Sequence, residues 1–400
     1  MEWKVLAALI SSCAAFVAQA GETGRWYDSE QRLSWGFAVE NGEATISTPD
    51  FWDSNARDNC KGDIVVPSRI GPDGPGGKTT YPVRDMAPGL FRNCTKVTGV
   101  TLPDGIRRIA PNAFYFDRNS TITNISVGAG CLDICDNAFL RCETLVSLNI
   151  PNTVTNIGAN AVSLCKVLPR IDIPGSVKTI SDSAFAACYA LEEVSFGDGV
   201  EIIDADAFLN CGALKSADLP SSVRSIGDRA FYGCSALNSV VLREGLESIG
   251  FCAFTQCESL LSASIPESVS YVGERAFQYC PDSIFDMSAV PGVLMLSGWA
   301  VGVKDPYGEI DLSGAAGIAD GLFNEQRSVT GVVLPDGLDA IGASMFRGCS
   351  SLSSVTVPPT VKSIGDYAFM GCEQLLSVVI PSASPTSASR RSRTAGNSTA

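Results

Sequence analysis

Residues 211–234 read CGALKSADLPSSVRSIGDRAFYGC, and this stretch contains one complete copy of the unit that repeats along the chain. In the segment LKSADL (214–219), the apolar residues Ala217 and Leu219 alternate with polar ones. This period of two predicts a short strand with one buried face. Pro220 cannot donate a ladder hydrogen bond and therefore ends this strand. A second short extended piece follows, and Ala230-Phe231 is expected to close the coil in a helical or 3₁₀ turn.

Cysteines recur in this unit with a period of 23 residues. The regular series is Cys142, Cys165, Cys188, Cys211, Cys234, Cys257 and Cys280, and it resumes after three periods with Cys349 and Cys372. An aromatic or aliphatic residue stands three positions before each of these cysteines. Phe114 and Phe139 are 25 residues apart, which indicates a two-residue insertion between them. These anchors predict about a dozen units between residues 68 and 381.

No single unit of this length can bury its apolar face alone, so each must stack on its neighbours. We therefore predict a right-handed α/β repeat solenoid with one continuous core. It is expected to be mostly β, with short helical or 3₁₀ turns, a parallel sheet along one wall and a small N-terminal β cap.

The repeat pattern L-x-x-[VIA]-x-[IL]-P-x-x-V-x-x-I-G-x-x-A-F-x-x-C resembles the BspA-like leucine-rich repeat. It is nearly undegraded in residues 211–234 and 349–372. Members of this family are secreted or surface proteins of bacteria and some protists. The resemblance implies a curved solenoid used for adhesion or protein binding, and it supplies no catalytic or cofactor residues.

The composition of the 400 residues argues against several other classes of function. Lys and Arg number 29 against 43 Asp and Glu, and a net charge of −14 repels nucleic-acid phosphates. The chain has no histidine, so the common nucleophile triads and imidazole metal sites are excluded. We expect no enzyme, cofactor or metal site. A secreted hydrolase is the weakest alternative, because a regular solenoid offers no deep pocket.

The amino terminus has the features of an export signal. Lys4 precedes an apolar run from Val5 to Val17, and Ala18-Gln19-Ala20 supplies a small-x-small cleavage site. We predict cleavage after Ala20 and a secreted or cell-surface protein. A lipoprotein signal with Cys13 as the lipid-bearing residue is the alternative. No other apolar run is long enough to span a membrane.

Departures from the repeat set the predicted domain boundaries. Residues 21–67 lack the period, and the Asn41-Gly42 pair between two apolar runs predicts a β-hairpin. The predicted segments are 1–20 for the signal peptide, 21–67 for the N-terminal β cap, 68–280 for a first array of repeats, 281–309 for an irregular β insertion or degenerate repeat, 310–381 for a second array, and 382–400 for a disordered Ser/Thr/Arg tail.

Outward-facing positions of the predicted strands form the candidate partner-binding face. They are Arg170, Asp172, Glu193, Ser195, Ser216, Asp218, Ser239, Ser262 and Ser264. The favoured partner is a protein, such as a host-matrix or cell-surface protein, so the chain is expected to be an adhesin or protein-binding module. A glycan is the alternative ligand, with Trp26, Tyr27, Trp35 and Trp52 of the cap as alternative contact residues, although core packing of the cap is the favoured role for at least Trp35. A structural scaffold, whose face would only keep the sheet soluble, is the third possibility.

The cysteines have two interpretations in an exported protein. Those of the regular series are expected to be buried free thiols whose side chains point inward in parallel, although the coil spacing also permits disulfides. Cys60, Cys135 and Cys252 are out of register and are expected to be more exposed. They are the candidates for a reactive thiol or a disulfide.

Overall fold

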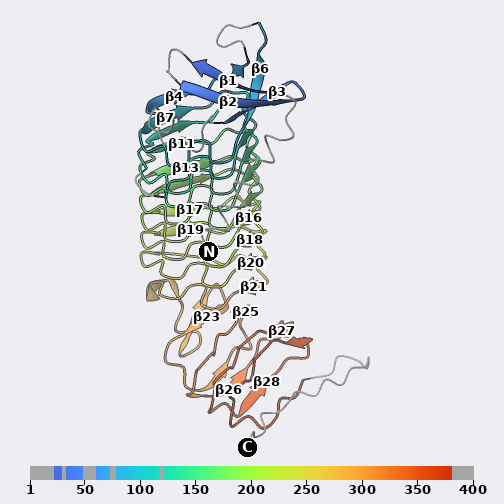
Figure 1. Ribbon diagram of the computed structural model, residues 1–400. Coiled ribbons are helices and arrows are strands. Elements are labelled where there is room, and N and C mark those ends of the chain that lie inside the picture. The colour runs from blue at the N-terminus through green and yellow to red at the C-terminus, as the bar shows by residue number, and fades with distance from the viewer. Residues whose placement is uncertain (1–21, 29–32, 48–59, 73–77, 118–119, 381–400) are drawn as a thin grey trace, which may run out of the picture. The chain divides into compact units, whose positions relative to one another are not determined.

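The computed structural model describes residues 22–28, 33–47, 60–72, 78–117 and 120–380, which belong to two compact units (Figure 1). Unit 1 is Met1–Val223 and unit 2 is Arg224–Ala400. The predicted signal peptide, the alternative lipid-bearing Cys13 and the Ser/Thr/Arg tail lie outside the described residues. Within the described ranges, no helix has the length and apolar character needed to cross a membrane.

Unit 1 opens with an antiparallel meander of β1 (Glu22–Asp28), β2 (Leu33–Glu40) and β3 (Glu43–Ser47). Asn41 and Gly42 join β2 to β3 with φ angles of 51° and 77°. Two left-handed residues in a two-residue loop give the strand twist that a hairpin requires, and Asn-Gly suits both positions. The hairpin predicted from the sequence is confirmed.

The N-terminal sheet is continued by β6 (Tyr81–Met86), which pairs in parallel with β3, and by β5 (Arg69–Ile70). On its other side, β6 meets the first repeat strands, because Arg107 N donates to Arg84 O at 2.8 Å. One strand therefore joins the N-terminal sheet to the stack of coils.

Two columns of parallel strands make the walls of unit 1, and Figure 1 shows their members one above the other. The first wall contains β4 (Gly62–Val65), β7 (Val97–Thr101), β9 (Asn124–Ser126), β11 (Ser147–Asn149), β13 (Arg170–Ile173), β15 (Glu193–Phe196) and β17 (Ser216–Asp218). The second wall contains β8 (Arg108–Ile109), β10 (Asp133–Ile134), β12 (Asn156–Ile157), β14 (Thr179–Ile180) and β16 (Ile202–Ile203). Equivalent residues pair one period apart, as Ile171 does with Val194.

The sequence predicts a helical or 3₁₀ turn at the Ala-Phe segment of each coil. In the structure, some backbone amides of this segment donate within their own coil and others donate to the next coil. Ala186 N donates to Ser183 O within the coil at 3.0 Å, which closes a single turn. Phe185 N donates instead to Ala207 O of the next coil at 2.8 Å. Because alternate amides bond between coils, the consecutive bonds of a helix do not form. The only helix in the described residues is η1 (Asp282–Ile284), so the fold is a β-solenoid with almost no helix.

Left-handed residues bound each of these turns. Ser183 and Ala187 have φ angles of 56° and 57°. The residues at the position of Ala187 in later coils, all with positive φ, are Asn210, Gly233, Gln256, Tyr279, Glu325, Gly348 and Gly371. This conformation costs a non-glycine residue about 1–2 kcal/mol, since its Cβ approaches the following carbonyl oxygen. Successive coils repeat this strained conformation, and it lets the chain change direction sharply at the two ends of each turn.

The phenylalanines of the repeat form stacked columns in the core of each unit. Neighbouring rings are nearly parallel, and their centroids lie 5.0–5.6 Å apart. The stacked pairs are Phe91–Phe114, Phe114–Phe139, Phe185–Phe208, Phe231–Phe254, Phe254–Phe277, Phe323–Phe346 and Phe346–Phe369. Phe114 and Phe139 keep this spacing although they are 25 residues apart, so the two-residue insertion does not interrupt the column.

Unit 2 has the same coil architecture, with an inserted hairpin. Its strands are β18 (Ser225–Ile226), β19 (Ser239–Val241), β20 (Ser248–Ile249), β21 (Tyr271–Val272), β22 (Val293–Leu296), β23 (Trp299–Val303), β24 (Gly308–Asp311), β25 (Gly317–Ile318), β26 (Val329–Val333), β27 (Ala340–Ile341), β28 (Ser354–Thr356) and β29 (Ser363–Ile364). Strands β22 and β23 form the hairpin around Ser297-Gly298. Asp320 N donates to Val272 O at 3.0 Å, so the coils on either side of the hairpin still stack.

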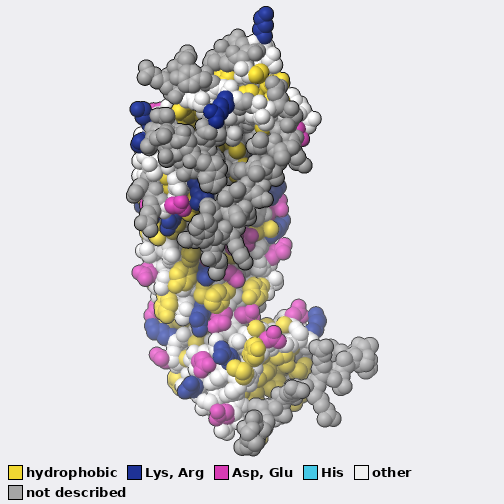
Figure 2. Space-filling view, viewed as in Figure 1, with side chains coloured by type: hydrophobic (Ala, Val, Ile, Leu, Met, Phe, Trp, Pro, Cys, Tyr) yellow, Lys and Arg dark blue, Asp and Glu magenta, His cyan; other side chains and the backbone are white. Residues whose placement is uncertain are grey.

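The last described coil of unit 2 shows what stacking contributes. Ile341 is fully buried, whereas Ile364, at the same position one period later, is 37% exposed. Tyr367, Met370 and Leu376 are also exposed, and Figure 2 shows apolar side chains gathered over this end of unit 2. Burial of a coil's apolar residues thus depends on a coil on each side of it, as expected for nearest-neighbour stacking.

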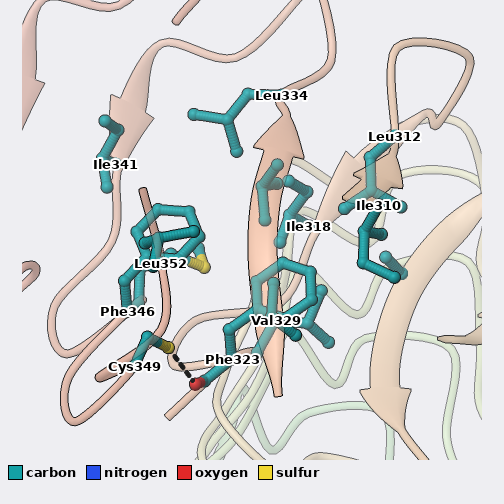
Figure 3. Packing of buried hydrophobic residues seen from close by; sticks show 14 of the residues in the cluster. Ile310, Leu312, Ile318, Phe323, Val329, Leu334, Ile341, Phe346, Cys349 and Leu352 are labelled. Atoms are coloured by element: carbon teal, nitrogen blue, oxygen red, sulfur yellow. Dashed lines mark hydrogen bonds between the residues drawn. The ribbon is translucent and has the colours of Figure 1, made fainter. Parts of the chain in front are cut away.

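The cysteines of the regular series are buried free thiols, and most of them donate to a backbone carbonyl of the preceding coil. Cys349 Sγ donates to Phe323 O at 3.0 Å, as the dashed line in Figure 3 shows. The same contact, at 3.0–3.5 Å, is made by Cys142, Cys165, Cys188, Cys211, Cys257, Cys280 and Cys372. Thiol and carbonyl satisfy each other inside the core, where an unpaired polar group is costly. These sulfurs point at carbonyl oxygens rather than at one another.

We predict that replacing Ala187 with glycine stabilises the protein. Glycine removes about 1–2 kcal/mol of left-handed strain but adds about 0.5–1 kcal/mol of chain entropy to the unfolded state, so a net gain of roughly 0.5–1 kcal/mol is expected. Three other coils already have glycine at this position. The free energy of unfolding in urea measures the change. The control is Ala186→Gly, which removes a buried methyl from a residue outside the left-handed region and should destabilise. A loss of stability in Ala187→Gly would contradict the strain argument.

We also predict that the thiols of the regular series resist modification until the protein unfolds. Burial raises the pKa of Cys188 and of Cys280 from 9.0 to about 12, so both stay protonated at pH 8, and the thiolate is the reactive form. Because the folded pKa values are the higher ones, their contribution to stability is complete below pH 9 and is lost as the pH rises toward 12.

Ellman titration of the reduced protein at pH 8 is the measurement for these thiols. Few thiols should react in the native protein and many more after addition of denaturant. Urea unfolding between pH 8 and 11 should show stability that falls only above pH 9. Equal thiol counts in the native and unfolded protein would show that the thiols are not protected.

Candidate functional site

Six residues of the candidate face lie in unit 1 and three in unit 2. The unit 1 face is made of Arg170 and Asp172 of β13, Glu193 and Ser195 of β15, and Ser216 and Asp218 of β17. All six side chains are exposed, while the residues between them, Ile171, Val194 and Ala217, are buried. The period-two alternation of each strand therefore separates core from surface.

The parallel register arranges the unit 1 face in rows. Arg170 pairs with Glu193, and Asp172 pairs with Ser195. Arg170 Nη2 donates to Asp172 Oδ1 at 3.2 Å, and Arg170 Nη1 lies 3.9 Å from Glu193 Oε2. The hydrogen bond with Asp172 is the main reason that the pKa of Arg170 lies above its usual value. Three carboxylates against one guanidinium make this face net acidic.

In unit 2 the candidate residues lie beside the inserted hairpin. Ser239 is half-buried and forms a parallel bridge with Ser262, which is exposed. The hydroxyl of Ser264 is 3.3 Å from that of Ser297 in the hairpin turn, and Ile265 N donates to Ser297 Oγ at 3.0 Å. The hydroxyl of Ser264 is therefore already in contact with the hairpin turn.

Of the aromatic residues considered as alternative contact residues, Trp26 and Trp35 are buried. Core packing, which the sequence favours for Trp35, is confirmed, whereas the alternative that Trp26 contacts a ligand is wrong. Trp35 packs edge-on against Phe91 with centroids 6.2 Å apart, because the inner face of the N-terminal sheet covers the first phenylalanine of the column. The Tyr27 side chain and Trp52 lie outside the described residues.

The cysteines outside the regular series are buried as well. Cys60, Cys135 and Cys252 are 7%, 8% and 6% exposed, so the expectation that these off-register cysteines are exposed is wrong. Cys135 shows why: Arg108 Nη2 donates to its sulfur at 3.3 Å, and the guanidinium helps to cover it. Burial raises the pKa of Cys135 to about 11 in spite of that contact, which leaves little thiolate at neutral pH.

One cluster that the sequence did not reveal joins coils two periods apart in unit 2. The hydroxyl of Tyr271 donates to Asp320 Oδ2 at 3.1 Å, and Asn324 Nδ2 donates to Glu274 Oε1 at 3.2 Å. Burial raises the pKa of Asp320, and burial together with the Asp320 carboxylate raises that of Tyr271 to about 12. Asp320 follows the hairpin, so only the structure shows which tyrosine it meets. Each donor is paired with an acceptor, which is the pattern of a structural contact.

Metal ligands do not gather anywhere in the described ranges: no group of three or more Cys, Asp or Glu side chains is placed to hold an ion. Charged side chains of both signs are interspersed on the face seen in Figure 2. Surface ion pairs between coils, such as Lys178 with Glu201 at 2.7 Å, account for many of them.

Comparison with known proteins identifies the repeat. The model of the BspA type leucine rich repeat region matches in six copies, over residues 80–188, 160–284 and 316–391. A leucine-rich repeat protein from Bacteroides ovatus has a similar solved structure, with 26% identity, a TM-score of 0.55 and coverage of 85% of this chain and 91% of that chain. A leucine rich cell surface protein from Faecalibacterium prausnitzii shows 24% identity, a TM-score of 0.48 and coverage of 88% and 93%. A search of the curated proteins returned no match.

These matches agree with the geometry of the coils. The family model spans most of the chain, and its repeats coincide with the columns of stacked phenylalanines and buried thiols. The chain belongs to the BspA-type leucine-rich repeat family.

Proposed function

We propose that this protein is an exported recognition protein, without enzymatic activity, whose unit 1 face binds a partner protein. The observation that supports this most directly is the exposure of Arg170, Asp172, Glu193, Ser195, Ser216 and Asp218 on three successive strands of one wall, of which β13 and β15 pair in parallel register. The buried residue between each pair locks its strand into the core. The exposed groups are therefore held in fixed positions before a partner arrives, which lowers the entropic cost of binding.

The charge of the unit 1 face indicates the chemistry of the partner. Its excess of carboxylates favours a basic surface, which would meet Glu193 and Asp218 with Lys or Arg side chains. Arg170 is already engaged by Asp172 and Glu193, so it orients the carboxylates as well as offering a positive charge. An interface of this kind is expected to weaken as salt is added.

The composition of this wall favours a protein partner over a glycan. The outward residues of β9, β11, β13, β15 and β17 are Asn, Ser, Arg, Asp and Glu. Sugar rings usually bind against exposed aromatic faces, and among these outward positions there is none. The remaining alternative, a scaffold that uses the wall only for solubility, predicts that no partner depends on the unit 1 face.

Export and the division of the chain complete the proposal. We propose that residues 1–20 are a signal peptide cleaved after Ala20, so that the protein acts in a secreted form or at the cell surface. Residues 21–67 then serve as the cap of the first array, 68–280. Trp35 packing on Phe91 supports that role for the cap. The hairpin region 281–309 separates this array from a second one, 310–381, and residues 382–400 form a tail.

We predict that a positive charge on the unit 1 face disrupts partner binding. The purified protein would be tested by surface plasmon resonance against immobilised extracellular-matrix proteins and a glycan panel. Glu193→Arg removes a carboxylate and places a like charge opposite the basic groups of the partner, so Kd for a protein hit should rise tenfold or more, about 1.4 kcal/mol. Raising the salt from 50 to 300 mM should also weaken binding of the unmodified protein.

The matched control is Ile202→Arg, which adds the same side chain to an exposed position on the second wall. It should change Kd less than twofold. Equal losses in the two variants would show that the unit 1 face is not the binding surface. Saturable binding to glycans alone, or to nothing on either panel, would reject the protein-binding proposal in favour of a glycan receptor or a scaffold.

A further inference from the structure

Two thiols outside the regular series are brought together at the start of the stack in unit 1. Cys60 stands just before β4, and Cys94 stands just before β7, its parallel neighbour. Two residues after each cysteine the strands are bonded, because Gly62 N donates to Lys96 O at 2.8 Å. Paired strands lie about 4.8 Å apart, so the register holds the two cysteine backbones within the span of roughly 4.4–6.8 Å that a disulfide requires.

The two side chains also converge. The thiols of Cys60 and Cys94 are hydrogen-bonded to each other, and both residues are buried. The regular thiols differ in this respect: Cys165 Sγ, for example, donates to Phe139 O at 3.4 Å in the preceding coil. Backbone spacing is similar for both kinds of pair, but only for Cys60 and Cys94 does sulfur face sulfur in the contacts described here. The geometry therefore separates this pair from the column that follows it.

We propose that Cys60 and Cys94 form a disulfide when the protein folds in an oxidising compartment. The oxidant is a small-molecule or protein disulfide. The thiolate of one cysteine attacks a sulfur of the oxidant and releases one oxidant thiol, which leaves a mixed disulfide. The thiolate of the second cysteine then attacks the protein sulfur of that mixed disulfide and releases the second oxidant thiol. Two protein thiols are oxidised, one oxidant disulfide is reduced to two thiols, and the two protons lost by the cysteines are taken up by the two oxidant sulfurs.

The bond would form while the segment is still accessible and would then be protected. In the folded, reduced protein, the hydrogen bond with Cys94 and burial hold the pKa of Cys60 well above its usual range, so a pair still reduced when the site closes would oxidise slowly, and burial then shields the bond that formed earlier. The disulfide would close a loop of the chain that contains β4, β5 and β6. It would therefore link strands of the N-terminal sheet covalently to the coil that contains Cys94. This inference concerns the cap and needs no partner, so it stands apart from the proposed binding face.

Peptide mapping of the whole chain tests the proposal. Reduced, unfolded protein would be refolded in a mixture of oxidised and reduced glutathione, alkylated with N-ethylmaleimide in denaturant, digested and analysed by mass spectrometry. We expect a reducible peptide that links Cys60 to Cys94 in most molecules, while cysteines of the regular series are alkylated without reduction. Closing this loop should also raise Tm above that of the reduced protein by roughly 5 °C or more.

Cys60→Ser should abolish the linked peptide and leave Cys94 alkylated. Cys135→Ser, the matched control, should keep the link, because Cys135 contacts Arg108 instead. Folded wild-type protein with Cys60 and Cys94 both alkylated under these oxidising conditions would overturn the proposal, and so would linkage of either cysteine mainly to another partner. If Cys60→Ser fails to fold, the wild-type map alone decides.

Discussion

The backbone hydrogen bond between turns of successive coils is the interaction on which the rest of the structure depends. Phe139 N donates to Ala161 O at 2.7 Å, and Phe185 N donates to Ala207 O at 2.8 Å. These bonds set the distance between coils at the position where most coils have a phenylalanine. The phenylalanine rings then stack at 5.0–5.6 Å, and regular thiols such as Cys211 donate to the carbonyl at this position of the preceding coil. A coil of different length must place its extra residues outside this column.

The stack and its period could be predicted from the sequence because the core is built from identical contacts. Phenylalanine and cysteine at fixed positions of the repeat predict stacked coils, and Asn41-Gly42 between two apolar runs predicts a hairpin. Each of these patterns is compatible with one low-energy structure. The helical turn could not be judged in the same way. Whether an amide such as that of Phe185 bonds within its coil or to the next one depends on the neighbouring coil, which local propensity does not describe.

The site was harder to predict than the fold for a related reason. Period-two alternation indicates which strand residues face outward, and Arg170 to Asp218 are exposed accordingly. Exposure outside the repeat depends on tertiary partners that no pattern encodes. Cys135 is covered by Arg108, Trp35 by the first coil, and Ser264 is met by the hairpin turn at Ser297. Residues that break the period are thus those whose surroundings only the structure reveals.

The distribution of constraints also explains where ligand specificity can reside. Turn positions such as Ala187 must accept a left-handed backbone, strand positions such as Ile171 must fill the core, and the thiols must reach a carbonyl. The outward strand positions have none of these duties, since the side chains of Arg170, Asp172 and Glu193 form ion pairs with one another and do not enter the core. Substitution there changes the charge and shape of the wall at little cost to the stack. A fold of this kind can therefore present different recognition surfaces on one unchanged core, and the acidic wall of unit 1 is the surface that this sequence presents.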